Sequence, residues 1–443
     1  MLGYFSKYLT RGTGVCSVSS HETTQVSAGI SASFGKIAKP LALASVLFLL
    51  GGCSGGGGNS GSEDKGGCTD RSYNIASVAA GTTYSLALAS DGKVYVSGQN
   101  SVGQIGFDSS LSVTPFTNLA FFDDKDIVAI SAGGSHSFAL SRNGVVYASG
   151  ENGNSQLGLD TTADQPVFIE VNSLIGKNIT AISAGVAHSL AVDGDGALYV
   201  AGDNSNGRTG LSTESGNTNT FTAITDLSGV KIVAVSAGEA HSLAIDSDGK
   251  VYAAGYGKDG RTGLGTSILT NNEKLSFTAV PFPDGVKIVA VSAGYDHSLA
   301  IAEDGALYVA GDASDGRLGI GTGSNQGAFT KADITALSGK VIVAAAAGDK
   351  HSVILASDGR VYTAGANSNG RTGRGTVSGN TDTFIQVVAP DKNITAIAAG
   401  FEHSLVISDE SVVYATGENG NGQLGHDGTT DVNVFTLSKS LLD

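Results

Sequence analysis

Apolar and polar positions alternate in short runs along most of this chain, and the runs come in groups of four. In one such group the runs span 179–184, 188–192, 197–201 and 221–224. Alternation with period two over four to six residues is typical of β-strands with one buried face. A tight corner at Gly185 and the pair Asp195-Gly196 separate the first three runs. This pair predicts a type I′ hairpin turn, in which both central residues have positive φ.

The group of four runs recurs seven times at nearly constant spacing. Each copy reads Ala-Gly-x-x-His-Ser-Leu or a close variant, then Val-Tyr-x-x-Gly, then Gly-Gln/Arg-x-Gly. Only the seventh copy lacks an Asx-Gly pair between the second and third runs. The first glycines, at steps of 52, 52, 53, 56, 54 and 52 residues, are Gly81, Gly133, Gly185, Gly238, Gly294, Gly348 and Gly400. Four antiparallel strands in about 50 residues make one propeller blade, so the sequence predicts an all-β, seven-bladed β-propeller of four-stranded antiparallel blades.

The three recurring motifs also resemble those of a known family. Ala-Gly-x-x-His-Ser-Leu, Asp-Gly-x-Val-Tyr-x-x-Gly and Gly-Gln-Leu-Gly are similar to the repeat of the regulator of chromosome condensation family, from Ile75 to about Leu437. The resemblance implies a seven-bladed propeller in which both termini contribute to ring closure. We therefore expect strands near 75–79 and 432–437 to meet. Family copies commonly carry Trp before the glycine of the third strand, whereas this chain has no Trp, so a binding role of those Trp residues does not carry over.

The N-terminal segment has a different character. Lys36 and Lys39 precede the apolar run 41–50, which is too short to span a bilayer but has the length of a signal-peptide core. The sequence Leu50-Gly-Gly-Cys53 that follows resembles the lipobox of bacterial lipoproteins, in which the cysteine is lipidated. Ordinary secretion with an incidental cysteine is the alternative.

These features divide the chain into three parts. We predict a leader with a lipoprotein signal peptide at 1–52, a lipidated Cys53 with a Gly/Ser-rich tether at 53–74, and the propeller at 75–443. A lipid anchor implies a location in the cell envelope outside the cytoplasm, at the outer membrane in a Gram-negative host.

The chain is acidic, with 41 Asp and Glu against 26 Lys and Arg. Removal of residues 1–52 takes away four basic and one acidic side chain, which moves the formal charge from −15 to −18. Nucleic-acid binding needs clustered Lys and Arg that displace counterions, so this balance argues against a nucleic-acid partner. Loss of Cys16 with the leader and lipidation of Cys53 leave Cys68 without an intrachain partner. We expect a monomer.

Residues that repeat at the same slot of each blade indicate structural roles. Tyr84 takes the slot of the repeated imidazole in the first copy, and the other six copies carry His136, His188, His241, His297, His351 and His403. We interpret these imidazoles as half-buried groups that bond backbone atoms at the strand corner. The loops 203–207 and 419–422 lack the spaced carboxylates of a calcium loop. We therefore predict no enzymatic activity, no catalytic residue, no cofactor and no metal.

Two loops of each copy vary while the rest of the repeat is kept. Because successive strands of a blade run antiparallel, the loops after the first and third strands emerge on the same face. Binding residues occupy such loops on rigid frames, although neutral drift at exposed turns is an equally good explanation. The candidate partner-binding residues are Glu151, Asp203, Glu239, Tyr256, Tyr295, Asp296, Asp312, Asp349, Lys350, Phe401, Glu402 and Glu418.

The character of these candidates suggests the kind of partner. Eight are carboxylates and three are aromatic, which favours a basic protein surface or a cationic ligand. Four consecutive copies replace the Gln of the last motif with Arg, and we expect each Arg to pair with a carboxylate or carbonyls of its own loop. These arginines are Arg208, Arg261, Arg317 and Arg371.

Three functions remain open on the sequence. The first is a membrane-anchored, extracytoplasmic scaffold that uses one propeller face to bind a protein. The second is a carbohydrate-binding or cell-wall-binding, lectin-like module, in which Tyr256, Tyr295 and Phe401 stack on sugars. The third is guanine nucleotide exchange, which only the family resemblance implies.

Overall fold

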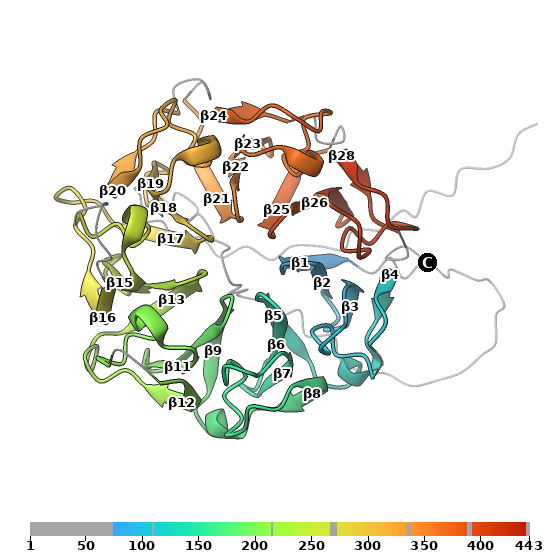
Figure 1. The fold of residues 1–443 in the computed structure, drawn as a ribbon, viewed down its shortest axis with the longest axis vertical. Helices are drawn as coiled ribbons and strands as arrows, with labels where there is room; N and C mark the ends of the chain where they lie inside the picture. The colour runs from blue at the N-terminus through green and yellow to red at the C-terminus, as the bar shows by residue number, and fades with distance from the viewer. Residues whose placement is uncertain are drawn as a thin grey trace, which may run out of the picture. The chain divides into compact units, whose positions relative to one another are not determined.

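Each sequence copy folds into one four-stranded antiparallel sheet. The computed structural model describes residues 74–108, 110–213, 216–265, 273–334, 337, 339–387 and 392–439. Its seven sheets surround a common centre (Figure 1). The predicted all-β, seven-bladed propeller of four-stranded antiparallel blades is confirmed. The predicted leader, Cys53, Cys68 and the tether up to residue 73 lie outside the described residues.

The strands of each blade follow one another in chain order from the centre outward. The innermost strands are β1 (Ile75–Ala80), β5 (Ile127–Ala132), β9 (Ile179–Ala184), β13 (Ile232–Ala237), β17 (Ile288–Ala293), β21 (Ile342–Ala347) and β25 (Ile394–Ala399). The second strands are β2 (Tyr84–Ala89), β6 (His136–Ser141), β10 (His188–Asp193), β14 (His241–Asp246), β18 (His297–Ala302), β22 (His351–Ala356) and β26 (His403–Ser408). The third strands are β3 (Val94–Gly98), β7 (Val146–Gly150), β11 (Leu198–Gly202), β15 (Val251–Tyr256), β19 (Leu307–Gly311), β23 (Val361–Gly365) and β27 (Val413–Gly417). The outermost strands are β4 (Val113–Asn118), β8 (Gln165–Glu170), β12 (Thr218–Ala223), β16 (Glu273–Ala279), β20 (Gln326–Lys331), β24 (Thr381–Gln386) and β28 (Val432–Leu437).

Short 3₁₀ turns complete the described elements. Two precede the next blade, η1 (Ala120–Phe122) and η2 (Asn172–Leu174). Four lie between the third and outermost strands, η3 (Ser205–Gly207), η4 (Lys258–Gly260), η5 (Ser314–Gly316) and η7 (Ser368–Gly370). Among the residues that the structure describes, no helix is long and apolar enough to cross a membrane.

The hairpin turns between second and third strands differ from the predicted type I′. In the third blade, Gly196 has φ +89° whereas Asp195 is not among the residues with positive φ. The Gly196 N–H donates to the Asp193 carbonyl at 3.0 Å, and the Asp193 N–H donates to the Ala197 carbonyl at 3.1 Å. This pattern is a type I turn followed by a glycine bulge, so only one residue needs positive φ. Ser411, with φ 62°, takes the glycine's place in the seventh blade.

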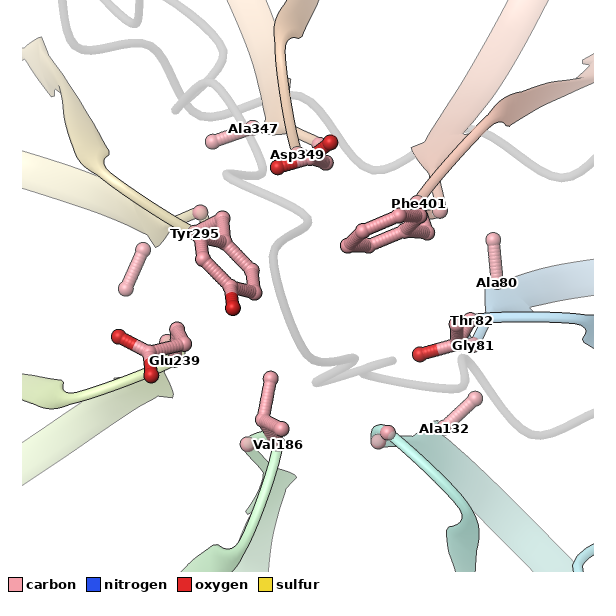
Figure 2. Close-up of a pocket in the computed structure, with 18 of the residues that line it drawn as sticks. Ala80, Gly81, Thr82, Ala132, Val186, Glu239, Tyr295, Ala347, Asp349 and Phe401 are labelled. Carbon is pink, nitrogen blue, oxygen red and sulfur yellow. The ribbon is translucent and has the colours of Figure 1, made fainter. Parts of the chain in front are cut away.

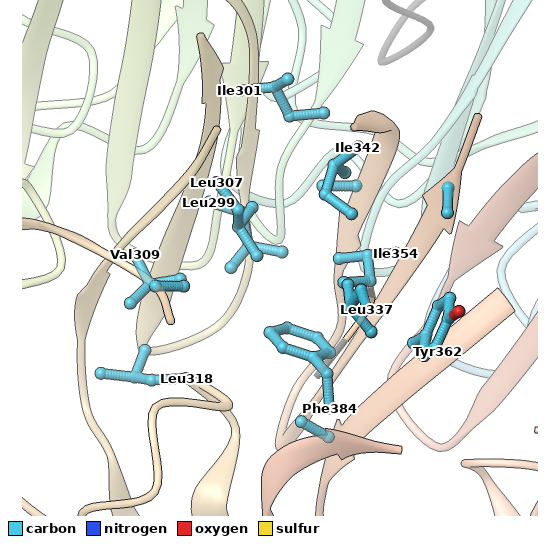
Figure 3. Packing of buried hydrophobic residues seen from close by; sticks show 14 of the residues in the cluster. Leu299, Ile301, Leu307, Val309, Leu318, Leu337, Ile342, Ile354, Tyr362 and Phe384 are labelled. Carbon is cyan, nitrogen blue, oxygen red and sulfur yellow. The ribbon is translucent and has the colours of Figure 1, made fainter. Parts of the chain in front are cut away.

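The hydrophobic core is divided among the blade interfaces. Each cluster of buried side chains in the described residues combines two neighbouring blades, as between blades five and six, where Leu299 and Val309 face Ile354 and Phe384 (Figure 3). Because a blade on either side covers each sheet, the second strands are buried along their whole length. The last glycine of each copy is required here, since a Cβ on Gly158 would lie 2.5 Å from the ring of Phe221 in the next blade.

The ring closes without sharing strands between the chain ends. β1 pairs with β2 and β28 pairs with β27, so the expected meeting of 75–79 with 432–437 is not a strand pair. Blades seven and one are instead joined by single main-chain hydrogen bonds, such as the one from the Phe401 N–H to the Gly81 carbonyl at 3.3 Å, and by side chains. His403 Nε2 lies 2.9 Å from Ser85 Oγ, and Ser97 Oγ donates to the Gly422 carbonyl at 2.6 Å. Ile75 and Val432 share the hydrophobic cluster at this interface.

Candidate binding face

The variable loops gather on one side of the propeller. We call the loop after each first strand the inner loop, the loop after each third strand the outer loop, and their common side the loop face. Within every blade, the N–H of the first outer-loop residue donates to the carbonyl of the last inner-loop residue at 2.8–3.0 Å, as Glu151 does to Ser135. The predicted placement of both loops on the same face is confirmed. The Asx-Gly turns lie on the opposite side, which we call the turn face.

The twelve candidate residues occupy three settings on the loop face. Glu239, Tyr295, Asp349 and Phe401 belong to inner loops and line a central cavity of about 120 Å³ (Figure 2). Asp296, Lys350 and Glu402 end their inner loops, and of these Lys350 is exposed. The remaining five lie where the third strands pass into the outer loops, Tyr256 as the last residue of β15, and are partly buried; they are Glu151, Asp203, Tyr256, Asp312 and Glu418.

Four arginines clamp neighbouring blades together. In each, Nε donates to a carbonyl of its own outer loop at 3.1–3.2 Å, in agreement with the expected local pairing. A second guanidinium nitrogen reaches the inner loop of the next blade at 3.0–3.3 Å, a contact that the sequence did not predict. The carbonyls that Arg208, Arg261, Arg317 and Arg371 hold are those of Glu239, Tyr295, Asp349 and Phe401.

The clamps therefore act on the inner loops that line the central cavity, and we call this part of the loop face the mouth. The four residues whose carbonyls they hold are four of the residues that line the central cavity. In the blades that keep Gln, the next inner loop presents the smaller Thr82, Gly134 and Val186. The sequence contains a signal for the contact between each arginine and the next inner loop, because each Arg lies one copy before a larger inner-loop residue.

Ion pairs neutralise much of the predicted acidic field. Six of the eight candidate carboxylates lie within 4.0 Å of a buried arginine, and Asp296 contacts both Arg261 and Arg317. Glu151 and Glu418 lie in the copies that carry Gln instead, and neither is in an ion pair among the described residues. Counting carboxylates alone overestimated the negative potential of this face, because four buried arginines lie within 4.0 Å of six of the eight carboxylates.

The repeated imidazoles are more deeply buried than predicted and bond side chains. Each of the six has no exposed surface, and its Nε2 lies 2.8–2.9 Å from the hydroxyl of a serine in the next blade. That hydroxyl donates to a main-chain carbonyl at 2.6–2.7 Å, as Ser189 does to Gln156, so the imidazole is the donor to it. Burial lowers the pKa of His136, His241 and His403 to about 3, and each imidazole is neutral at physiological pH.

Tyr84 fills the same role at the first interface. Its fully buried hydroxyl donates to the His136 carbonyl at 2.5 Å and accepts from the Gly133 N–H at 3.1 Å. Burial raises the pKa of this phenol. The structural interpretation of the repeated slot is confirmed, and its partner is the neighbouring blade and not the strand corner of the same blade.

The loop face thus carries a mouth whose inner loops are held by buried arginines. No group of three or more His, Cys, Asp or Glu in the described parts of the chain is placed to hold a metal ion. What the fold and site define is a seven-bladed propeller with one preorganised face. The chain belongs to the regulator of chromosome condensation repeat family: residues 17–281 match the RCC1-like domain, and residues 288–317, 342–371 and 394–423 match the RCC1 repeat.

Several characterised proteins are similar to this chain. The ultraviolet-B receptor UVR8 of Arabidopsis thaliana is 31% identical over 368 residues, which are 82% of this chain and 81% of the receptor. The regulator of chromosome condensation of Xenopus laevis is 26% identical over 77% of this chain and 82% of its own length. The human E3 ubiquitin-protein ligase HERC2 is 32% identical over 73% of this chain, but the match spans only 7% of the ligase.

Solved structures share the same fold. Human WBSCR16 superimposes with a TM-score of 0.68 at 20% identity, over 76% of this chain and 87% of its own. Prp20p from Saccharomyces cerevisiae superimposes with a TM-score of 0.67 at 20% identity, over 81% of this chain and 88% of its own. At this level of identity the likeness concerns the fold alone.

Proposed function

We propose that this chain is a protein-binding scaffold that holds its partner on the loop face. The observation that carries the proposal is the coincidence of the four arginine clamps with the mouth. Buried arginines fix the loops that present Glu239, Tyr295, Asp349 and Phe401, so these groups lose little conformational freedom on binding. Aromatic side chains at the centre of a rigid, partly desolvated surface are typical of the residues that dominate binding energy at protein interfaces.

Two neighbours in fold support a protein partner as the class. One structure describes the binding properties of yeast Prp20p to Gsp1p and histones, and another shows Kap60 bound to yeast RCC1 (Prp20). Identities of 19–20% do not transfer those partners to this chain. They support binding, in place of catalysis, as the activity that we propose.

The carbohydrate alternative receives less support from the geometry. The guanidinium of Arg261 lies over the Tyr256 ring at 5.2 Å, and Tyr295 and Phe401 meet edge to face with centroids 5.8 Å apart. Sugar stacking needs an open aromatic face, and these contacts occupy part of all three rings. Nucleotide exchange rests on the family alone.

We further propose that the scaffold is lipid-anchored outside the cytoplasm through Cys53. Its support is the lysines, the apolar run and the Leu50-Gly-Gly-Cys53 sequence together. Palmitate labelling of the full chain is expected to disappear in Cys53→Ala, with Cys68→Ala as the matched control that keeps it. Equal labelling of the Cys53→Ala chain and the wild-type chain would overturn the anchor without touching the binding proposal.

Capture of a partner by matched variants tests the binding function. The double variant Tyr295→Ala, Phe401→Ala removes the aromatic pair of the mouth. The control Val233→Ala, Val341→Ala truncates two exposed side chains at the other end of innermost strands. We expect a partner captured from envelope extract by the wild-type chain to be retained by the control and lost from the double variant. Retention by both would place the binding surface elsewhere.

A further inference from the structure

The central cavity of the loop face has an unusual lining. Its wall consists mostly of the Ala-Gly pairs that end the innermost strands, and Thr82 and Val186 contribute small side chains (Figure 2). Glu239 and Asp349 are the charged residues of this lining, and both are acidic. The cavity thus combines an apolar wall with negative charge.

Asp349 is the more constrained of the two carboxylates. Its side chain is 5% exposed, and its nearest cation, Arg371, lies 4.0 Å away. Among the described residues its carboxylate oxygens accept no hydrogen bond, although a desolvated carboxylate normally accepts two or more. Burial raises its pKa, whereas Lys350, Arg317 and Arg371 oppose that rise. A buried carboxylate with so few partners favours a cationic ligand that supplies the missing hydrogen bonds.

Two aromatic rings form one wall of the same cavity. Tyr295 and Phe401 come from the fifth and seventh blades and meet at an interplanar angle of 75°, and Asp349 comes from the sixth blade (Figure 2). The Tyr295 hydroxyl points into the cavity and makes no hydrogen bond among the described residues. Burial raises its pKa, and the carboxylates of Glu239, Asp296 and Asp349 act in the same direction.

We propose that this cavity binds one primary ammonium group, carried by a lysine side chain of the protein partner. The inference rests on the proposed function and names the chemistry that its mouth recognises. The ammonium donates to the carboxylate of Asp349, while the alkyl stem lies along the aromatic wall. An anion would meet two carboxylates and no cationic side chain of the lining, and an apolar ligand would leave the Asp349 carboxylate without a hydrogen-bond donor.

A blocked lysine peptide tests the cavity separately from the partner. Acetyl-Gly-Lys-Gly-amide carries its only ammonium on the side chain, and its Nε-acetylated form has the same shape without the charge. We expect the charged peptide to shift the ring resonances of Tyr295 and Phe401 in NMR titrations of the full chain. Acetylation or the isosteric Asp349→Asn should weaken its binding by about tenfold or more.

Two further variants keep the result interpretable. Tyr295→Ala should also weaken the peptide, and the control Glu303→Gln removes an exposed charge from the turn face and should leave its affinity unchanged. Equal affinity for the charged and acetylated peptides, or wild-type affinity in a folded Asp349→Asn chain, would overturn the lysine site. If the mouth double variant still loses the partner in that case, the proposed function stands and only the lysine site fails.

Discussion

The six buried imidazoles make the stability of the propeller fall steeply as the pH drops below 6.5. Burial holds the native pKa of His136, His241 and His403 at about 3 and that of the other three imidazoles well below 6.5. Between the native and the unfolded pKa, these imidazoles therefore bind protons only in the unfolded chain. The contribution of these imidazoles to the free energy of unfolding is therefore present above pH 6.5. It is lost progressively as the pH falls toward the native pKa.

The size of the effect follows from the number of imidazoles. At pH 5.5, protonation of one unfolded His with a pKa of about 6.5 destabilises the native state by about 1.4 kcal/mol. Six such groups give a loss of about 8 kcal/mol, which is comparable to the whole stability of many domains, about 5–15 kcal/mol. Asp349 and Glu239 act in the opposite direction because burial raises their pKa values, but carboxyl groups ordinarily titrate at lower pH than imidazoles.

Denaturant unfolding at several pH values measures this loss. Circular dichroism between pH 7.5 and 5.5 gives the free energy of unfolding, and its slope gives the number of protons taken up on unfolding. His351→Tyr, which copies the residue of the first blade, should take up about one proton fewer than the wild-type chain. A free energy that stays flat from pH 7 to pH 5.5 would refute the assignment of six buried, neutral imidazoles.

Three further predictions concern the frame of the binding face, and each is measured by thermal and chemical unfolding. Arg371→Met should lower the free energy of unfolding by about 3 kcal/mol because it leaves the Glu402 carboxylate without its cation. The exposed control Arg142→Met should lower it by less than about 1 kcal/mol, and equal losses would contradict the clamp. Gly316→Ala should lower the free energy of unfolding by about 3 kcal/mol, since φ is +82° and the new Cβ would meet the Thr381 carbonyl. The control Gly323→Ala places its Cβ in open space, and similar stabilities of the two variants would count against this packing. Deletion of 432–443 removes β28 and should lower the melting temperature sharply, and an unchanged melting temperature would show that the last strand is dispensable.

Local patterns predicted the fold of this chain because each blade is built from one continuous repeat. The alternation of apolar and polar residues predicted the strands, and the Asx-Gly pairs predicted the hairpins. The seven copies predicted the number of blades in the ring. The turn type was wrong, since Asp195 keeps negative φ and a glycine bulge absorbs the twist. The chain ends meet as expected, through the hydrophobic cluster that Ile75 and Val432 share, but their strands do not pair with each other.

The site was harder to predict because its decisive contacts cross between blades. Counting residues on the loop face found all four groups at the mouth, but it could not show that Arg261 and Arg317 neutralise Asp296. The imidazoles were expected to bond their own strand corner, whereas their partners lie about 53–57 residues further along the chain, or at Ser85 for the last blade. A single repeat does not show which residues of the next blade its side chains contact. Comparison of successive repeats shows some of these contacts, as for the arginines and the inner loops of the next copy.

Site-specific photo-cross-linking tests the central claim, that the loop face binds a protein, most directly. A benzophenone side chain placed at Phe401 reports on the mouth, and one placed at Glu303 reports on the turn face. The account predicts that cells that express the full chain yield a defined protein adduct from position 401 and none from position 303. The same adduct from position 303 alone would contradict it.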